Sequence, residues 1–188
     1  MKKNPLHYVD NEQFLVSINE YQIAVKFSKE NNEPEPPIPE YLGECFMKIA
    51  NRLSFRPKFI NYAFRDDMIS DGIENCIQYM NNFNPEKSSN PFAYFTQIIY
   101  YAFVRRIQKE KKQLYIKYKT MDTQSIMQEN HHVEDRDLGE NYNYETMTND
   151  QKINMYNFID NFEKNKKKKK IAAKAKSNTS TLEMFIRY

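Results

Sequence analysis

The sequence predicts an all-α protein, and three observations support this fold class. Apolar residues recur at helical spacing in several segments, and no segment shows the alternating pattern of a strand. Only 3 of the 188 residues are glycine, which disfavours a turn-rich β fold. Prolines cluster where helices would begin or end. We therefore expect a small helical domain followed by a flexible C-terminal tail.

Two helices are expected in the first third of the chain. The first begins near Asp10 and Asn11, which can cap a helix, and the proline-rich stretch 31–39 must end it. The second is expected from about Glu40 to Ser54, with Pro57 as a break after it. The apolar faces comprise Phe14, Leu15, Ile18, Tyr21 and Val25 in the first helix, and Leu42, Cys45, Phe46, Ile49 and Leu53 in the second.

Two further helices are expected between residues 66 and 118. The third spans about 66–82, and Asn84-Pro85 ends it. The fourth begins at Asn90-Pro91, a favoured cap followed by a favoured first residue, and extends as far as Tyr118. The third helix should have an apolar stripe of Ile69, Ile73, Ile77 and Met80, with Asp67, Ser70, Asp71 and Glu74 on the opposite face. The core residues of the fourth should be Phe92, Phe95, Ile99, Ala102 and Phe103.

The helical signal weakens after residue 120. Residues 121–150 are polar and acidic and are expected to form a loose connector. One more amphipathic helix is expected, with Ile153, Tyr156, Ile159 and Phe162 on its apolar face. The chain therefore divides into an N-terminal helix and linker (1–39), a helical core (40–119), an acidic connector with a possible helix (120–163), a lysine-rich tether (164–180) and a hydrophobic terminal peptide (181–188).

The net charge of +3 conceals strong segregation of charge. Residues 91–119 carry seven basic side chains and one acidic one, whereas residues 120–163 carry two basic and ten acidic ones. Residues 164–176 carry eight lysines and no acid. This alternation indicates a protein that contacts a polyanion with one part and keeps it away from another.

Several classes of site are disfavoured by what the sequence lacks. Its two cysteines, Cys45 and Cys76, are not in CxxC spacing, so we expect neither a disulfide framework nor a zinc site. His131 and His132 lie in an acidic segment without a second ligand cluster, and we expect no metal or other cofactor. No apolar run is long enough to cross a membrane, and no signal region follows Met1. We expect a soluble cytoplasmic protein that is not an enzyme, because no catalytic set of residues is recognisable.

Two motifs in fixed register resemble the part of bacterial sigma factors that binds RNA polymerase and opens the promoter. Residues 67–72 read Asp-Met-Ile-Ser-Asp-Gly, where the family has Asp-Leu-Ile-Gln-Glu-Gly. The twelve residues that follow end in Asn-Phe-Asn, where the family ends in Lys-Phe-Asp or Lys-Phe-Glu at the same spacing. In the second motif, Phe-Ser-Thr-Tyr-Ala-Thr-Trp-Trp-Ile-Arg-Gln-Ala, the family register is kept by Tyr94, Thr96, Ile99 and Ala102. The resemblance covers residues 66–112.

This resemblance implies two binding surfaces. The acidic face would contact the clamp helices of bacterial core RNA polymerase, and the aromatic helix would contact promoter DNA. In the family, the tyrosine that matches Tyr94 stacks on the melted strand, and Phe83 would line the same pocket or serve as a core anchor. The implied polymerase-binding residues are Asp67, Ser70, Asp71 and Glu74. The implied DNA-binding residues are Phe83, Tyr94, Thr96, Gln97, Ile98, Tyr101, Arg105, Arg106, Lys109 and Lys112.

The sequence departs from the family at the positions that open and read DNA. The tandem tryptophan is replaced by Gln97 and Ile98, the reading glutamine by Tyr101 and the reading threonine by Val104. We therefore expect weak unaided melting and a factor that depends on help, such as a co-activator. The basic side chains from Arg105 to Lys112 exceed what a helix C-terminus needs, and this favours phosphate contact.

The terminal peptide is similar to that of the late-transcription sigma factors of T4-type bacteriophages. In that family, a leucine, an acidic residue and bulky apolar residues bind the phage sliding clamp. Here the matching positions are Leu182, Met184, Phe185 and Ile186, with Glu183 between the first two. The resemblance implies that the protein acts in the cytoplasm of the infected bacterial host. Two alternatives remain: a polymerase-binding co-regulator that does not read DNA, and a small nucleic-acid-processing enzyme, which the missing catalytic residues disfavour.

Overall fold

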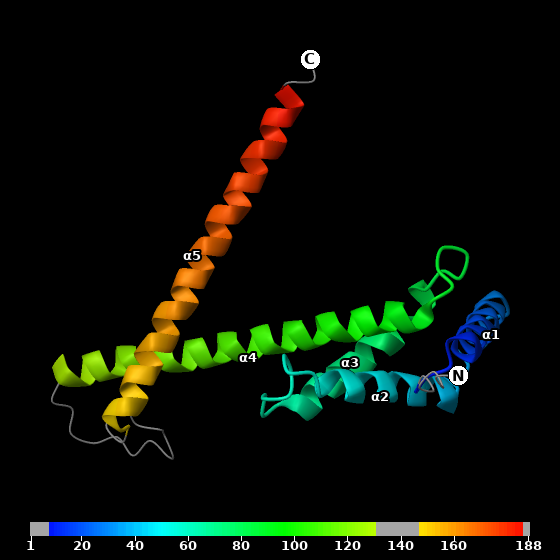
Figure 1. The fold of residues 1–188 in the computed structure, drawn as a ribbon, viewed down its shortest axis with the longest axis horizontal. Helices are drawn as coiled ribbons and strands as arrows, with labels where there is room; N and C mark the ends of the chain where they lie inside the picture. Colours follow the sequence, from blue (N-terminus) through cyan, green and yellow to red (C-terminus); the bar gives the residue numbers. More distant parts are fainter. Residues whose placement is uncertain (1–7, 131–146, 186–188) are drawn as a thin grey trace, which may run out of the picture. The chain divides into compact units, whose positions relative to one another are not determined.

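Every regular element in the part of the chain that the computed structural model describes is a helix (Figure 1). The structure describes residues 8–130 and 147–185, with side chains described for residues 8–123 and 147–173. In these ranges there is no strand, so the all-α prediction is confirmed. None of the helices found there is both long enough and apolar enough to cross a membrane.

The chain divides into two compact units, residues 1–109 and 110–188, and the longest helix contributes to both. This division falls inside the predicted core of residues 40–119. The elements are α1 (Asn11–Glu30), α2 (Glu40–Ser54), α3 (Arg65–Tyr79), the 3₁₀ helix η1 (Met80–Asn82), α4 (Pro91–Asn130) and α5 (Asn149–Phe185).

Side-chain caps fix the beginnings of α1 and α4. The carboxylate of Asp10 accepts hydrogen bonds from the backbone N–H groups of Glu12 and Gln13, at 2.9 and 3.3 Å. The side-chain oxygen of Asn90 accepts one from the backbone N–H of Ala93 at 2.9 Å. These bonds satisfy donors that have no partner within the first turn of a helix. Both predicted caps are confirmed.

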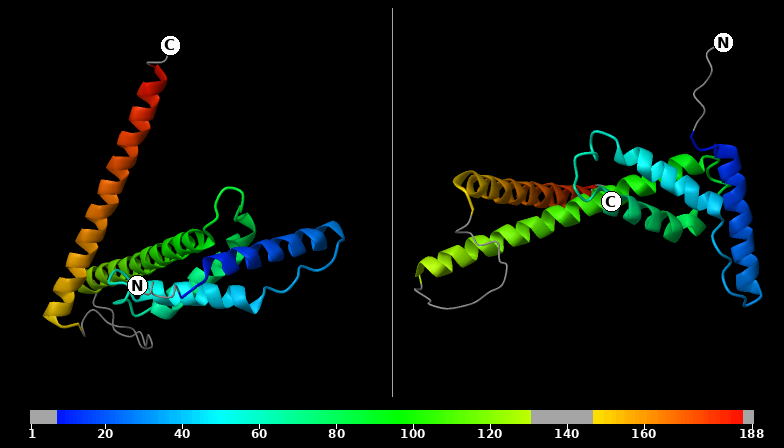
Figure 2. Two further views of the ribbon diagram at one scale, coloured as in Figure 1. Left: turned by 45° about the vertical axis from the view of Figure 1, so that its right-hand side comes forward. Right: turned by 90° about the horizontal axis from the view of Figure 1, so that it is seen from below.

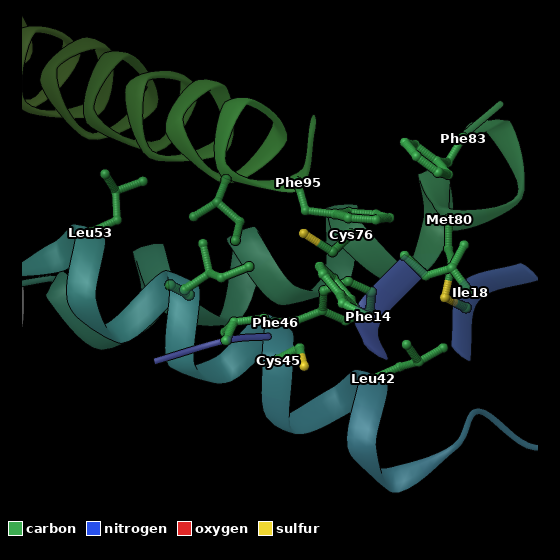
Figure 3. Packing of buried hydrophobic residues seen from close by; sticks show 14 of the residues in the cluster. Phe14, Ile18, Leu42, Cys45, Phe46, Leu53, Cys76, Met80, Phe83 and Phe95 are labelled. Carbon is green, nitrogen blue, oxygen red and sulfur yellow. The ribbon is translucent and has the colours of Figure 1, made fainter. Parts of the chain in front are cut away.

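One hydrophobic core joins α1, α2, α3 and α4 in the first unit (Figure 3). The ring centroid of Phe95 in α4 lies 5.5 Å from that of Phe14 in α1 and 4.8 Å from that of Phe46 in α2. All three rings are fully buried, and contacts at this separation add to the free energy gained from burial. In the right-hand view of Figure 2, α1 runs across the direction of α2 and α4.

The buried face of α3 differs from the predicted apolar stripe. Met68, Gly72 and Cys76 are buried, while Ile77 remains 42% exposed. Of the predicted stripe, only Met80, in η1, is fully buried, and Ile69 and Ile73 pack at the edge of the core. The stripe was therefore placed one residue too late along the helix.

Gly72 explains why the observed buried face of α3 differs from the predicted one. A Cβ atom at Gly72 would lie 3.1 Å from both Ile99 Cγ2 and Phe103 Cε1, closer than ordinary packing allows. The missing side chain lets α3 approach α4 closely, and this contact turns the face with Met68 and Cys76 inward. Because glycine has no apolar side chain, the search for an apolar stripe in the sequence did not place Gly72 on the buried face of α3.

In the second unit, the later part of α4 pairs with the first part of α5. The rings of Tyr115 and Phe162 stack with centroids 4.4 Å apart, and Tyr118 meets Phe158 edge to face at 5.6 Å. The Tyr115 hydroxyl donates a hydrogen bond to Glu163 at 3.0 Å, which raises the pKa of that hydroxyl. Three further side chains are buried in this unit: Met121, Met155 and Ile159.

The second unit corrects three expectations about the end of the chain. α4 continues to Asn130, because Met121 is buried in the unit, so any connector starts later than residue 121. Residues 131–146, with both histidines of the acidic segment, lie outside the described residues. Of the predicted apolar face, Ile159 and Phe162 do pack, whereas Ile153 is 56% and Tyr156 44% exposed. Met155 and Phe158 complete the packed face of α5.

The lysine-rich segment 164–180, predicted as a tether, continues α5 as a helix. Lysine and alanine, which dominate this segment, are both strong helix formers, and no glycine or proline interrupts them.

Candidate nucleic-acid interface

The acidic face of α3 is already engaged by a cation from α4. Nη2 of Arg106 lies 2.9 Å from Oδ2 of Asp67, and Nη1 lies 3.4 Å from Oδ2 of Asp71. The Arg106 side chain is only 18% exposed, whereas that of Asp67 is 58% exposed. Arg106 thus engages both carboxylates, and Asp67, the more exposed of the two, is the more accessible to an external cation.

The other two acidic-face candidates lie differently. Ser70 and Glu74 are both exposed. Glu74 thus offers a carboxylate on α3 at a distance from the Arg106 pair. The i,i+4 spacing of Asp67 and Asp71 places them on one face of a helix. That spacing was the available sequence signal that one arginine would bridge both carboxylates.

The basic side chains at positions 105–112 divide into engaged and exposed groups. Nη2 of Arg105 donates a hydrogen bond to Oδ1 of Asn75 in α3 at 2.6 Å. Together with Arg106, it ties α4 to α3. Lys109 and Lys112 are exposed, and no ion pair of either is found among the described side chains. These two lysines are therefore the more accessible phosphate contacts of the predicted set.

Phe83 is a core anchor in this structure. It is 3% exposed, and its ring centroid lies 5.2 Å from that of Tyr94. Nε2 of Gln22 in α1 donates hydrogen bonds to the carbonyl oxygens of Phe83 and Met80, at 2.9 and 3.0 Å. This burial fits the role of a core anchor, and the part of Phe83 in DNA binding stays a prediction.

Tyr94 is half-buried at the edge of this cluster. Its ring meets Phe95 edge to face, with centroids 5.0 Å apart. Its hydroxyl donates to the carbonyl oxygen of Tyr79 at 3.5 Å. Burial raises the pKa of Tyr94, and nearby Cys76 adds to the effect. The raised pKa keeps the hydroxyl neutral, as an ordinary tyrosine also is at physiological pH.

Three of the remaining aromatic-helix candidates, Thr96, Gln97 and Tyr101, border a groove between α2 and α4, whereas Ile98 does not line it. Gln97 is exposed, Tyr101 is 52% exposed, and Thr96 and Ile98 are half-buried. The groove encloses about 580 Å³. Its walls comprise Leu53, Arg56, Asn90, Phe92, Ala93, Thr96, Gln97, Tyr100 and Tyr101.

A second groove, of about 640 Å³, adjoins the first and was missed from the sequence. The two share Leu53, Arg56, Phe92 and Thr96, so they form one continuous surface. The second adds Tyr8, Ile49, Arg52, Phe55 and Pro57. The basic residues that follow the predicted second helix were the signal that could have found it.

Cations and aromatic rings alternate along this surface. The guanidinium carbon of Arg52 lies 4.8 Å from the ring centroid of Tyr8. The ammonium of Lys58 lies 4.7 Å from the ring centroid of Tyr100 and donates a hydrogen bond to its hydroxyl. We call this surface the α2–α4 groove, defined by Tyr8, Arg52, Arg56, Lys58, Thr96, Gln97, Tyr100 and Tyr101.

The α2–α4 groove has the chemistry of a surface for single-stranded nucleic acid. Exposed aromatic faces stack on bases of any sequence, while cations neutralise phosphates. Gln97 adds donors and an acceptor for a base edge. Oγ1 of Thr96 is shielded from solvent and has no hydrogen-bond partner in the described part of the chain. The groove thus combines stacking, charge and limited hydrogen-bonding capacity.

The remaining candidate sites yield little. Among the described residues, no group of three or more His, Cys, Asp or Glu side chains is placed to hold a metal ion. Burial raises the pKa of the Cys76 thiol far above its usual range, so it stays protonated. Leu182, Met184 and Phe185 fall in the last turn of α5, where side chains are not described, and Ile186 lies outside the described residues.

No protein-family model matches the chain, and no curated protein matches it in sequence.

Proposed function

We propose that this protein is a sigma factor of the T4-type late class. It binds bacterial core RNA polymerase, recognises and helps to open a −10-like promoter element, and binds the phage sliding clamp through its C-terminus. The chain itself performs no chemistry, because catalysis belongs to the polymerase. Its place of action is the cytoplasm of the infected host.

The observation that carries this proposal is the pairing of its two motif helices. The segments that resemble the family, 67–72 and 94–102, fall on α3 and α4, which meet at Gly72. The carboxylates of the first motif and the exposed aromatic residues of the second lie on the surface of one compact unit. A factor that bridges polymerase and DNA needs both surfaces on one rigid body.

In this proposal the α2–α4 groove holds the melted strand. Tyr100 and Tyr101 replace base stacking, and Arg52 and Arg56 neutralise phosphates. Gln97 contacts a base edge in place of the aromatic wedge of the family. Without that wedge, melting depends on the polymerase and on a co-activator.

The test is transcription in vitro with bacterial core polymerase on supercoiled DNA that carries AT-rich phage late promoters. Initiation that requires this protein and maps to one position supports the proposal. Glu74→Lys should reduce polymerase binding, because it reverses an exposed charge without touching the Arg106 pair. Binding without initiation, even with clamp, loader and co-activator present, would contradict it.

One observation favours a second candidate, a polymerase-binding co-regulator that does not read DNA. Arg105 and Arg106 are both occupied by side chains of α3, so two of the predicted phosphate ligands are engaged internally. Under this alternative, Tyr101→Ala and Gln97→Ala would leave all promoter functions unchanged. Under the first proposal, the same substitutions reduce promoter opening.

A further inference from the structure

The later part of α5 carries an unusual concentration of positive charge. Residues 164–176, which we call the lysine arm, contain eight lysines and no acidic residue. α5 packs against α4 through Phe158 and Phe162, both before the arm begins. Every side chain described in the arm, from 164 to 173, is exposed. The arm is thus a helix without a packed face over these residues.

Only the first lysine of the arm has an acidic partner among the described side chains. Nζ of Lys164 lies 2.5 Å from Oδ2 of Asp160, one turn earlier in α5. The five lysines 166–170 form no ion pair within the described residues. Their charge is therefore available to a partner.

The arm is electrostatically unfavourable as an isolated helix. Lys166 and Lys170 are four residues apart, and Lys167 and Lys170 are three apart, so like charges lie side by side. Each such pair costs about 0.2–0.5 kcal/mol. Helices without tertiary packing are marginal in water. A ligand of opposite charge would remove this repulsion and stabilise the helix.

The distribution of charge identifies the shape of that ligand. Consecutive lysines are separated by about 100° around a helix, so the run 166–170 directs charge to all sides. An acidic protein surface would meet one side only. The major groove of DNA, about 12 Å wide, admits an α-helix and places phosphates along both of its walls. A helix that is cationic all round matches that environment.

We propose that the lysine arm binds duplex DNA along the major groove, through phosphates and without sequence preference. Its thirteen residues span about 20 Å, or roughly six base pairs at 3.4 Å each. Phosphate contacts position a protein but carry no sequence information. This second DNA site is separate from the α2–α4 groove and does not depend on the proposed promoter function.

The test measures binding of the full chain to a fluorescent duplex of about 30 base pairs without promoter-like sequence, over a range of salt concentrations. The arm variant carries Lys166→Gln, Lys167→Gln, Lys169→Gln and Lys170→Gln, which keep helix propensity but remove charge. The control variant removes four exposed lysines of the first unit: Lys26→Gln, Lys29→Gln, Lys48→Gln and Lys87→Gln. A third variant replaces the same four arm lysines by arginine.

The slope of log affinity against log salt should fall by about 0.9 for each phosphate that the arm no longer neutralises, so by roughly 3 to 4 in the arm variant. The slope of the control variant should change much less, and the arginine variant should retain the full slope. Far-UV circular dichroism of the wild-type protein should show a gain in helicity when duplex DNA is added. The arm variant should not show that gain.

Three results would overturn the proposal. The first is equal slopes for the arm and control variants. The second is competition by polyglutamate as effective as competition by DNA at equal charge. The third is equal affinity for duplex RNA, whose narrow major groove excludes side chains. Start-site mapping with the arm variant separates this site from the promoter function, because its α3 and α4 are unchanged.

Discussion

Gly72 sets how closely α3 and α4 approach each other. Gly72→Val would place its Cβ 3.1 Å from Ile99 and Phe103, with two further carbons to accommodate. We expect this overpacking to lower the free energy of unfolding by about 1–3 kcal/mol. Urea denaturation followed by circular dichroism measures the change.

Gly43 in α2 is a control position where an added side chain meets no neighbour. A Cβ atom at that position would meet nothing within 4 Å, so Gly43→Ala gains helix propensity without a clash. We expect it to stabilise the protein by up to about 1 kcal/mol. A Gly72→Val protein as stable as the wild type would contradict the close approach of the two helices.

Arg106 restrains the carboxylates that we propose for polymerase binding. Arg106→Gln removes both ion pairs, and since Asp67 is largely exposed, we expect stability to fall by only about 1 kcal/mol. Freed Asp67 and Asp71 should associate faster with core polymerase at low salt. Surface-immobilised polymerase and stopped-flow mixing measure the association rate.

Arg105→Gln is the control, because it removes the same charge but a different interaction, the hydrogen bond to Asn75. Association that accelerates in the Arg106 variant alone supports competition between Arg106 and the polymerase. Slower association of the Arg106→Gln protein would mean that the polymerase contacts the positive charge of Arg106 in the wild-type protein, and not Asp67 and Asp71.

Single-residue prediction succeeded where local chemistry decides the structure. Asp10 and Asn90 cap their helices because a short polar side chain can reach the free N–H groups of the next turn. It failed for the face of α3, because the close contact at Gly72 depends on Ile99 and Phe103 from another helix. The ion pairs of Arg106 were also missed, because the spacing of Asp67 and Asp71 indicates a shared partner but not which side chain of another helix supplies it.

At the scale of elements, α1 holds the segment that joins α3 to α4. Gln22 donates two hydrogen bonds to carbonyl oxygens at Met80 and Phe83, where the α-helix gives way to η1. Gln22→Ala leaves two part-buried acceptors without these donors, which should cost about 1–3 kcal/mol. Thermal and urea unfolding measure this destabilisation.

Gln13→Ala is the matched change on α1, because Gln13 is exposed and its side chain makes none of these bonds. We expect it to alter stability by less than about 0.5 kcal/mol. Because Phe83 supports Tyr94, Gln22→Ala should also weaken binding of single-stranded DNA. Equal effects of the two substitutions would show that the contact with α1 does not hold this segment.

Element bounds were predictable for α1 and α2 because prolines and capping residues mark them. The length of α4 was underestimated, since its charged second half lacks the apolar periodicity that identifies a helix. That half pairs with α5 through the stacked rings of Tyr115 and Phe162, which lie far apart in the sequence. Long-range pairing of this kind leaves little trace in a local window of sequence.

At the scale of the whole molecule, the two proposed nucleic-acid-binding surfaces lie on different units of the chain. The first unit carries the α2–α4 groove, and the second carries the lysine arm. The sequence indicated this separation through its alternation of charge but did not locate the boundary at residue 109. The boundary lies inside α4, where one continuous helix gives no local signal of a change in packing partners.

The terminal peptide, residues 181–188, has a role that deletion can test. Under the proposed function, residues 181–188 bind the sliding clamp and raise the effective concentration of polymerase at the promoter. Deleting them should spare initiation from supercoiled DNA but abolish its stimulation by clamp and loader. Transcription with and without the clamp measures both quantities in one experiment.

The helical form of the preceding segment sharpens this test. When bound DNA stabilises the lysine arm as a helix, α5 extends about 33 Å from Lys164 to Phe185 at 1.5 Å per residue, and the peptide is then carried on a stiff arm. A stiff connection tolerates changes of length less well than a flexible one, because the bound ends must match in distance. Inserting a glycine-rich segment after residue 176 should therefore reduce clamp stimulation while leaving the peptide intact.

Substitutions within the peptide test the contact itself. Leu182→Ala with Phe185→Ala should abolish the stimulation by the clamp, and the control Thr179→Ala with Ser180→Ala should not. Full stimulation of the deleted protein would instead place the clamp contact elsewhere in the chain.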